Sequence, residues 1–457
     1  MKYVLRDNQE LLIKDTLDFI HNDGARNGLV VAPVAFGKSL CIANLAKELG
    51  EDVLCIQPSV ELLNQNYDKY LSYGNEAAIY SASLGQKDIG NVTFATPISV
   101  ANNAKDFKHI KTVIADEIHL GSRVGGKFHD CLKTINPKKV VGLTASPVYL
   151  QTTPFGSVLN MMNRTNKSFF KKIVHVSQIQ DMVSKRYWSS LSYENRYVDT
   201  SMLVYNTTGS DFSEGSMLSM YEANNTEANI IKEVEIAISE GRKSILVFVP
   251  LIDVADDLAS KIEGAYSVSS KTPKKEREDI IYKFKNGDIQ VVINVNLLST
   301  GFDHPGLDCI ITARPTASLA MYYQQLGRGV RILEGKIDCK VVDLAGNSYK
   351  FGAIEDINFH NLDGYGWGMF SGDRLISGIP LSESMVTTKQ QLQNKGKQHL
   401  QTQAFWFGKY SGNTIQEVFK KDPRYLGWIA SDDFKPSNNK TKQFQTQVSN
   451  FIKQQLL

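Results

Sequence analysis

The stretch Ala32-Pro33-Val34-Ala35-Phe36-Gly37-Lys38-Ser39 governs how the rest of the sequence is interpreted. An apolar run precedes it and a segment with helical spacing follows it. A strand, a tight turn and the start of a helix can bind phosphate groups, because the first N–H groups of the helix point at the anion. Gly37 permits the turn, Lys38 can reach the outer phosphates, and the Ser39 hydroxyl is placed for magnesium. An ordinary strand–turn–helix would look the same, so this run alone leaves both interpretations open.

Two carboxylates, Asp116 and Glu117, come directly after the apolar, strand-like run Thr112–Ala115. Ligands of open parallel sheets bind at the carboxyl ends of the strands. Asp116 could hold a magnesium ion, and Glu117 could take a proton from an attacking water. The alternative is an acidic cap on a strand. Because a phosphate loop lies upstream, we favour the catalytic interpretation.

Two arginines, Arg328 and Arg331, fall near the end of a predicted helix with a spacing that places them on one face. We expect them to lack carboxylate partners and to bind phosphate, which suits the guanidinium group. An arginine supplied across a domain cleft can stabilise phosphoryl transfer. The alternative is basic charge that complements the helix dipole. That alternative does not account for Gln324 and Gly327, which accompany the arginines.

Apolar, strand-like runs alternate with helical stretches twice along the chain, from Gly28 to about Pro147 and again from about Thr226 to Leu344. Such alternation predicts an α/β fold with parallel sheets covered on both faces. The strand-like runs are Gly28–Ala32, Val53–Gln57, Val92–Ala95, Thr112–Ala115, Val140–Leu143, Ser244–Val249, Val291–Asn294, Asp308–Thr312 and Lys340–Asp343. The helical stretches are Ser39–Leu49, Val60–Tyr70, Leu251–Ile262, Pro273–Lys285 and Ser318–Arg328.

The chain of 457 residues is long enough for two or three domains. We expect an ATP-binding lobe at 1–150, an irregular connector at 151–225, a second lobe at 226–347, an extension and polar linker at 348–403, and a small accessory module at 404–457. Aromatic side chains in the connector or extension, Trp188 or Trp367, are candidates for a wedge that separates a duplex; packing of loops is the alternative.

Composition narrows the cellular setting. The net charge of +3 does not reveal a nucleic-acid binder, since basic patches can hide within a balanced total. No two of the five cysteines form a Cys-x-x-Cys pair, so we expect reduced thiols and no zinc site. Four of the five sit among apolar neighbours and are expected to be small core residues. No apolar run approaches the roughly 20 residues that span a bilayer, and the start of the chain lacks an apolar signal region. We therefore expect a cytoplasmic protein without a membrane partner.

The phosphate loop, Asp116-Glu117-Ile118-His119 and the block from Gln324 to Arg331, in this order, resemble superfamily 2 helicases of the DExH type over roughly residues 3–350. The resemblance implies two tandem RecA-like lobes, with ATP and Mg²⁺ bound between them and DNA as partner. It implicates further residues motif by motif: Arg6 and Gln9 in reading adenine, Ala35 and Phe36 with the rest of the phosphate loop, Gly301 and Asp303 in nucleotide binding, Pro58, Ser59, Thr96 and Thr300 in contacting nucleic acid, and Thr144 and Ser146 in coupling hydrolysis to strand movement. The family tolerates Ala32 at the first loop position, whereas Val34-Ala35-Phe36 departs from its usual run.

Within that superfamily the sequence is most similar to branch-migration and repair helicases of the RadD and UvsW types and their tailed-phage relatives. The block Gly301-Phe302-Asp303-His304-Pro305 carries this similarity, although the cysteine cluster near the C-terminus of the RadD type is missing. The resemblance implies action on single-stranded, forked or four-way DNA in repair, recombination or replication. On the same ground we expect a monomer with replication or recombination proteins as partners. We also expect a phage origin, which would place the protein in the host cytoplasm.

The end of the chain resembles a second family. Phe407–Gly412 and Asp422–Ile429 are similar to the small C-terminal module of exonuclease-X-like proteins. Its residues Lys409, Tyr410, Arg424 and Trp428 could bind DNA by charge and stacking, or they could be the core and turns of the module. We expect the whole protein to be an ATP-dependent DNA helicase or translocase. An RNA helicase of the same fold, or a switch or motor component of a nuclease assembly, remain alternatives.

Overall fold

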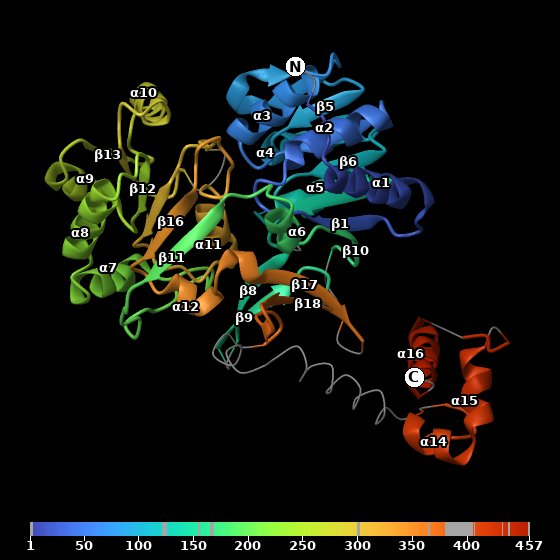
Figure 1. Ribbon diagram of the computed structural model, residues 1–457. Coiled ribbons are helices and arrows are strands. Elements are labelled where there is room, and N and C mark those ends of the chain that lie inside the picture. The colour runs from blue at the N-terminus through green and yellow to red at the C-terminus, as the bar shows by residue number, and fades with distance from the viewer. Residues whose placement is uncertain are drawn as a thin grey trace. The chain divides into compact units, whose positions relative to one another are not determined.

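The computed structural model describes residues 3–120, 126–153, 156–164, 169–298, 302–363, 366–379, 405, 407–431, 433–436 and 439–455. The chain divides into two compact units, Met1–Asn358 and Phe359–Leu457. The first unit holds two α/β lobes, each built on its own sheet (Figure 1). The α/β prediction with tandem parallel-sheet lobes is therefore confirmed.

The sheet of the first lobe has eight strands in the order β10-β1-β7-β6-β2-β5-β3-β4. All neighbours are parallel except β3 and β4. The central strands are buried along their whole length, which is why they appear in the sequence as continuous apolar runs. The strands are β1 (Asn27–Val31), β2 (Val53–Ile56), β3 (Ala78–Ser81), β4 (Gln86–Lys87), β5 (Val92–Ala95), β6 (Thr112–Ala115), β7 (Lys139–Thr144) and β10 (Lys172–Val176).

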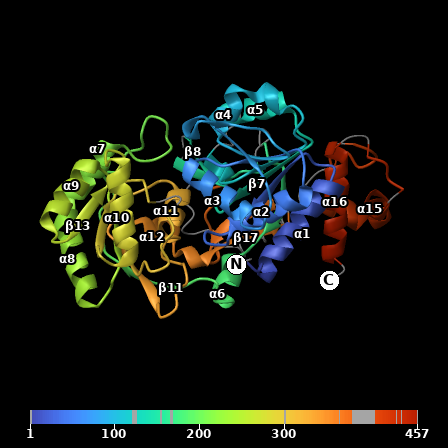
Figure 2. The same ribbon diagram turned by 90° about the horizontal axis from the view of Figure 1, so that it is seen from above.

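Helices α1, α2 and α3 follow one another across the first lobe, and α4 and α5 lie together apart from them (Figure 2). Their bounds are α1 (Asp7–Asn22), α2 (Lys38–Leu49), α3 (Val60–Leu71), α4 (Pro97–Asn102) and α5 (Lys127–Ile135), with short 3₁₀ turns η1 (Ala82–Leu84), η2 (Ala104–Phe107) and η3 (Ile118–Leu120). The two helices expected here, Ser39–Leu49 and Val60–Tyr70, are confirmed to within one residue at each end.

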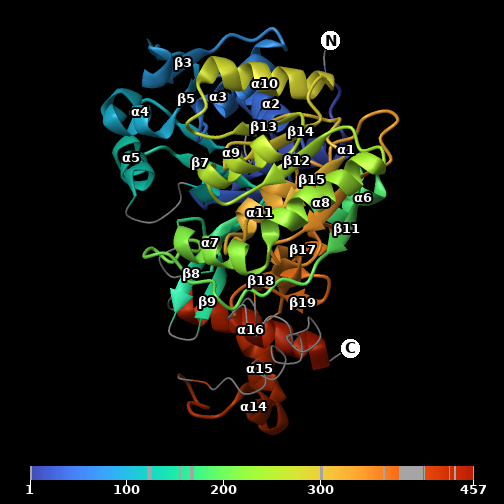
Figure 3. The ribbon, with the colours of Figure 1, turned by 90° about the vertical axis from the view of Figure 1, so that its left-hand side faces the viewer.

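The sheet of the second lobe has six strands, all parallel, in the order β11-β16-β15-β12-β14-β13. Helices α8, α9 and α10 cover the face turned to the viewer in Figure 3, where apolar side chains of α8 and α9 pack on the strands. The elements are α7 (Glu214–Ala223), α8 (Thr226–Ser239), β12 (Ile245–Phe248), α9 (Ile252–Lys261), β13 (Ala265–Val268), α10 (Lys274–Asn286), β14 (Val291–Asn294), β15 (Cys309–Thr312), α11 (Leu319–Leu326), β16 (Asp338–Asp343), α12 (Asn347–Phe351) and η4 (Ile354–Asp356).

The expectation of an irregular connector at 151–225 is wrong. This segment contains a hairpin of β8 (Val148–Thr153) and β9 (Gly156–Met161), then strand β10, helix α6 (Ile179–Ser184) and strand β11 (Ser190–Asn195). β10 completes the first sheet and β11 the second, so the chain crosses between the lobes after α6. Both are edge strands with partly exposed faces, and their mixed polar sequence hides the apolar signal.

The second unit contains a small sheet, whose first strand begins two residues before the unit does, and a group of helices. Strands β17 (Ile357–Leu362), β18 (Gly366–Ser371) and β19 (Arg374–Leu375) form a three-stranded sheet. Further along, α14 (Ile415–Lys421), α15 (Pro423–Ala430) and α16 (Asn439–Gln455) are held by a core of their own. That core consists of Phe405, Ile415, Val418, Leu426, Ile429, Phe434, Phe444, Val448 and Phe451.

All five cysteines are buried as free thiols, whereas the sequence predicted a core position for four of them. Burial raises the pKa of the Cys41 thiol to about 12. Among the described residues, none of the helices is both long and apolar enough to cross a bilayer.

Candidate functional site

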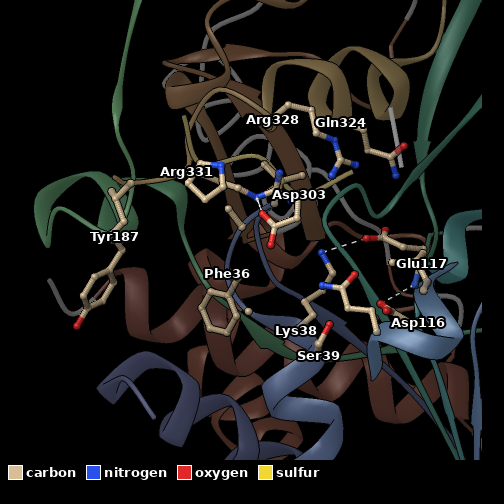
Figure 4. Close-up of a pocket in the computed structure, with 18 of the residues that line it drawn as sticks. Phe36, Lys38, Ser39, Asp116, Glu117, Tyr187, Asp303, Gln324, Arg328 and Arg331 are labelled. Atoms are coloured by element: carbon tan, nitrogen blue, oxygen red, sulfur yellow. Dashed lines mark hydrogen bonds and ion pairs between the residues drawn. The ribbon is translucent and has the colours of Figure 1, made fainter. Parts of the chain in front are cut away.

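The candidate site lies where several parallel strands of the first lobe end, facing the second lobe. The phosphate loop follows β1, Asp116 follows β6, and Thr144 ends β7, so these groups share one edge of the sheet. A cavity of about 330 Å³ opens there and is lined by both lobes (Figure 4). Its lining includes Arg6, Val34, Ala35, Phe36, Gly37, Lys38, Ser39, Asp116, Glu117, Tyr187, Asp303, Gln324, Gly327, Arg328 and Arg331.

The phosphate loop has the backbone that its sequence predicts. Ala35 and Gly37 have φ angles of 53° and 90°, in the left-handed region. The Gln9 side chain fixes the loop from behind, because its Nε2 donates a hydrogen bond of 2.7 Å to the Phe36 carbonyl. A Cβ atom on Gly37 would lie 2.5 Å from that same Nε2, and the φ of 90° would strain any residue with a side chain at this position. The Phe36 side chain is fully buried, which explains how a bulky residue is accommodated here.

Lys38 and the acidic pair meet at the floor of the cavity. Lys38 Nζ lies 3.2 Å from Glu117 Oε1, and Figure 4 shows both side chains beside Asp116. Asp116 accepts hydrogen bonds from Asn66 Nδ2 at 3.1 Å and from the Glu117 backbone N–H at 2.9 Å. Glu117 has a φ of 43°, a strained value for a residue with a side chain.

The two carboxylates differ in their charge environment. Burial, with the neighbouring Glu117 charge, raises the pKa of Asp116 to about 6. Burial also acts to raise the pKa of Glu117, but the nearby charges of Lys38 and His119 outweigh it, and the pKa lies below its usual value. Glu117 is therefore the carboxylate that stays ionised to lower pH.

His119 connects the acidic pair to the loop after β7. Its Nδ1 lies 3.4 Å from Glu117 Oε2 and 2.9 Å from Thr144 Oγ1. Thr144 also accepts a hydrogen bond from the Ser146 backbone N–H at its Oγ1, and another from the Ala32 N–H at its carbonyl. Thr144 thus contacts both the phosphate loop and the acidic segment. The sequence showed His119 beside the carboxylates but gave no sign of its partner, which lies 25 residues further along the chain.

The arginines of the second lobe reach the roof of the cavity. Nη1 of Arg328 and Nη1 of Arg331 each donate to the Phe302 carbonyl at 2.7 Å. Burial lowers the pKa of Arg328 to about 9. The expectation that neither arginine has a carboxylate partner is wrong for Arg331, whose Nε lies 2.8 Å from Asp303 Oδ1. Gln324 lines the same roof, one helical turn before Arg328.

Gly327 lets the two lobes approach each other. A Cβ atom at this position would lie 2.5 Å from Val34 Cγ2 of the phosphate loop and 2.9 Å from the Tyr323 carbonyl. Trp188 approaches the same loop and donates from Nε1 to the Val34 carbonyl at 3.1 Å. Trp188 is 5% exposed, so the idea that it wedges a duplex apart is wrong and the packing alternative holds. Trp367 is half-buried in β18.

Tyr187 is a lining residue that sequence reasoning missed. The Arg6 guanidinium lies 4.3 Å from the centre of the Tyr187 ring, and both line the cavity. Figure 4 shows Tyr187 and the acidic pair on opposite sides of the phosphate loop. Arg6 Nη1 is buried without a hydrogen-bond partner in the described part of the chain. The aromatic residues between the lobes were a signal for this position, but nothing in the sequence tied one of them to Arg6.

The expected nucleic-acid contacts lie along the same sheet edge but outside the cavity lining. Pro58 and Ser59 follow β2, and the Ser59 hydroxyl caps α3 by accepting from the Leu62 N–H at 3.3 Å. Thr96 follows β5, and its hydroxyl lies 2.9 Å from the Ser99 hydroxyl. These residues are half-buried. Thr300 and Gly301 lie outside the described residues.

The residues present fit a magnesium–nucleoside triphosphate. The strained loop before α2 and the cations Lys38, Arg328 and Arg331 surround one cavity, as polyphosphate requires. Mg²⁺ prefers oxygen ligands, and Ser39 and Asp116 supply a hydroxyl and a buried carboxylate at the same edge.

Comparison with known families agrees with this geometry. Residues 2–149 match the model described as "Type III restriction enzyme, res subunit", and residues 227–333 match "Helicase conserved C-terminal domain". Residues 405–432 match "Exodeoxyribonuclease X-like C-terminal". Each of the first two matches falls within one lobe.

Similar proteins span the same region. A Saccharomyces cerevisiae relative that carries the name of an ATP-dependent helicase, IRC3, is 24% identical over 76% of this chain and 52% of its own length. The DNA 3′-5′ translocase XPB2 of Sulfurisphaera tokodaii is 24% identical over 72% of this chain and 79% of its own length. This chain thus spans about half the length of the yeast relative. The solved structure of the Type ISP restriction-modification enzyme LlaBIII has the same fold, with a TM-score of 0.56 at 15% identity over 76% of this chain and 28% of that one.

Proposed function

The chain belongs to superfamily 2 of the helicases, and from that premise we propose that it hydrolyses ATP to move along DNA and separate its strands. One observation carries the proposal: Lys38 and the acidic pair of one lobe share a single cavity with Arg328 and Arg331 of the other. A site completed by two lobes can couple hydrolysis to their relative movement, because loss of the γ-phosphate removes the contact that bridges them.

We assign roles to the cavity residues from their positions. Lys38 binds the outer phosphates of ATP. Before ATP binds, the Lys38 ammonium group pairs with Glu117. Glu117 is the base that takes the proton of the attacking water, and its lowered pKa keeps it ionised for that step. Arg328, Arg331 and Gln324 act from the second lobe on the charge of the transferring group. Ser39 and Asp116 would hold Mg²⁺, which when bound neutralises phosphate charge.

Coupling to the strand runs through the loops at the same sheet edge. Thr144 contacts the phosphate loop and His119, so a change at Glu117 reaches the loop that contains Ser146. Pro58, Ser59 and Thr96 lie at the ends of neighbouring strands and are proposed to hold the phosphate backbone, with Thr300 and Gly301 assigned only by resemblance. Contacts to the backbone rather than to bases make the grip independent of sequence.

The proposed substrate is DNA, and the proposed direction is 3′ to 5′. Support comes from the XPB2 translocase, whose name states both. We expect this protein to displace a labelled strand from a forked duplex with a 3′ loading tail, and not from one with only a 5′ tail. A forked RNA duplex serves as the matched substrate, because backbone contacts alone do not distinguish the sugar. Displacement of RNA but not DNA would make the protein an RNA helicase; displacement of neither would remove the strand-separation proposal.

Forked and four-way DNA, compared in the same assay, test action on branched substrates in repair or recombination.

Arg6 and Tyr187 are proposed to hold the base of ATP at the end of the cavity away from the acidic pair. We expect Tyr187→Ala to raise the KM for ATP by about fivefold, because an aromatic contact contributes roughly 1 kcal/mol, and to leave kcat within about twofold. Steady-state ATPase kinetics check this. Tyr197→Ala removes an aromatic ring that is 88% exposed in the segment after β11, and it should change neither constant. A fall in kcat with an unchanged KM would contradict the role in binding.

A motor without strand separation, acting within a nuclease assembly, is the second candidate. The match of the first lobe to a restriction-enzyme subunit favours it. Such a protein would show DNA-stimulated ATPase but no displaced strand in the fork assay. It would also displace a protein bound to duplex DNA, because a motor that moves along the duplex without unwinding it pushes bound proteins off.

A further inference from the structure

The small helical module at the end of the chain carries charge that the motor does not use. Residues 405–457 contain eight Lys and Arg against four Asp and Glu, so this segment is basic while the chain as a whole is close to neutral. The helices α14, α15 and α16 close a compact core, and the side chains of Lys420, Lys421, Arg424 and Lys442 are exposed outside it. A basic, folded module suits a polyanionic partner.

The residues singled out in the sequence separate into two groups. Tyr410 is part of the packing, since its hydroxyl donates to Asp422 Oδ2 at 2.9 Å and its ring lies 5.0 Å from that of Tyr425. Lys409 lies 3.4 Å from Asp422 and over the Tyr410 ring. Arg424 and Trp428, in contrast, are exposed on α15, four positions apart and therefore on one face of the helix.

Trp428 is held in place but not covered. Its ring centre lies 5.1 Å from that of Phe434, nearly perpendicular to it, and 5.6 Å from that of Tyr425. These contacts fix the indole on a rigid helix while 45% of the residue stays exposed. A pre-positioned aromatic ring beside a cation is the arrangement that binds unpaired bases, because every base has a flat face that can stack.

The residues around Trp428 indicate which kind of ligand fits this surface. Among the described residues of the second unit, Trp428 is the one large apolar side chain that is exposed. A protein partner would need a contiguous apolar patch of several hundred Å², whereas a single nucleobase needs one ring. The adjacent Arg424 can pair with a phosphate. A duplex keeps its bases stacked within the helix, so the fit favours a single strand.

We propose that Arg424 and Trp428 form a second site for single-stranded nucleic acid, separate from the two-lobe motor, in which a base stacks on Trp428 and a phosphate pairs with Arg424. The site acts as an anchor, because it needs no nucleotide and no movement of the lobes. This second site does not depend on the proposed motor function, because its binding is measured without ATP. If one of the two proposals fails, the other is unaffected.

The test is the affinity of the full chain for a fluorescent oligothymidine, measured by anisotropy without nucleotide over a range of salt concentrations. We expect Trp428→Ala to weaken binding by about tenfold, the loss typical of one stacked base. Trp428→Phe should recover most of it, since a flat ring remains. Arg424→Gln should weaken binding and reduce the slope of log affinity against log salt by about 0.7, the value for one phosphate contact to a single strand.

Two controls separate the site from general effects. Tyr197→Ala removes an exposed ring of the first unit and should not change the affinity. Lys442→Gln removes an exposed cation of α16 and should not alter Trp428-dependent binding. All variants should keep the basal ATPase rate of the unaltered chain. Circular dichroism shows whether the module stays folded in Trp428→Ala. If it does not, the affinities of Trp428→Phe and Arg424→Gln test the proposal instead. Wild-type affinity and an unchanged salt slope in Arg424→Gln would overturn the proposal, as would wild-type affinity in a folded Trp428→Ala protein.

Discussion

Lys38→Ala is expected to abolish ATP hydrolysis. The ammonium group is the one cation contributed to the described cavity by the phosphate loop, and it also neutralises the buried Glu117 carboxylate at 3.2 Å. Its removal takes away phosphate binding and leaves the negative charge of Glu117 without its main partner, which raises the pKa of that carboxyl. We expect a loss of at least about a thousandfold in kcat/KM, because ground-state binding and transition-state stabilisation fail together.

The measurement is phosphate release at saturating DNA, with Lys47→Ala as the control. Lys47 lies on the same helix α2 but is exposed, so its loss tests for a general effect on that helix. The control should retain full activity. Thermal melting should show both variants folded. A Lys38→Ala protein with more than a tenth of the normal rate would place the phosphates elsewhere.

Arg331→Ala is expected to stop turnover while leaving nucleotide binding nearly intact. In the structure Arg331 Nε pairs with Asp303, and Nη1 is bonded to the Phe302 carbonyl. It lines the cavity from the lobe opposite Lys38, where it can act when charge develops during transfer. An arginine supplied in this way contributes roughly 10³- to 10⁵-fold to kcat in related phosphoryl-transfer reactions. We expect a loss in that range, with the Kd for ATP changed by less than about fivefold, since uniform binding is not its role.

Two further variants show whether the loss of turnover in Arg331→Ala is specific to the guanidinium group. Arg331→Lys keeps the charge but not the planar fork, so it should recover little activity. Lys243→Ala removes an exposed cation of the same lobe and should behave as the unaltered protein. Loss of ATP binding in Arg331→Ala, in parallel with loss of turnover, would assign it to ground-state binding instead.

Much of the fold could be predicted because parallel sheets bury their strands. Val53–Ile56 and Ile245–Phe248 are covered on both faces, so burial left a continuous apolar signature in the sequence. Strands at the sheet edges carry no such signature. β11 is half-exposed and reads as Ser-Leu-Ser-Tyr-Glu-Asn, and the segment that contains it was therefore predicted to be irregular.

The site could be predicted where its residues follow strand ends within one short motif. Lys38, Asp116 and Glu117 meet in one cavity with Arg328 and Arg331, as the motif order implied. What could not be predicted are contacts between distant segments. Neither the pairing of Arg331 with Asp303 nor the hydrogen bond of His119 to Thr144 has a local signal.

Steric requirements between lobes were also invisible in the sequence. Gly327 is needed because Val34 of the other lobe occupies the space of a Cβ atom, and Tyr187 enters the cavity because the chain crosses between lobes just there. Such facts depend on how closely two surfaces approach, which a linear pattern of residue types does not encode.

The most direct test of the account is the ATPase rate of the full chain titrated with single-stranded DNA, run beside Lys38→Ala and Arg331→Ala. A site shared by two lobes that also hold a strand predicts that turnover rises with added DNA until it saturates, and that neither variant responds. A rate that stays the same with single-stranded, forked and four-way DNA, or a response that survives loss of Arg331, would contradict it.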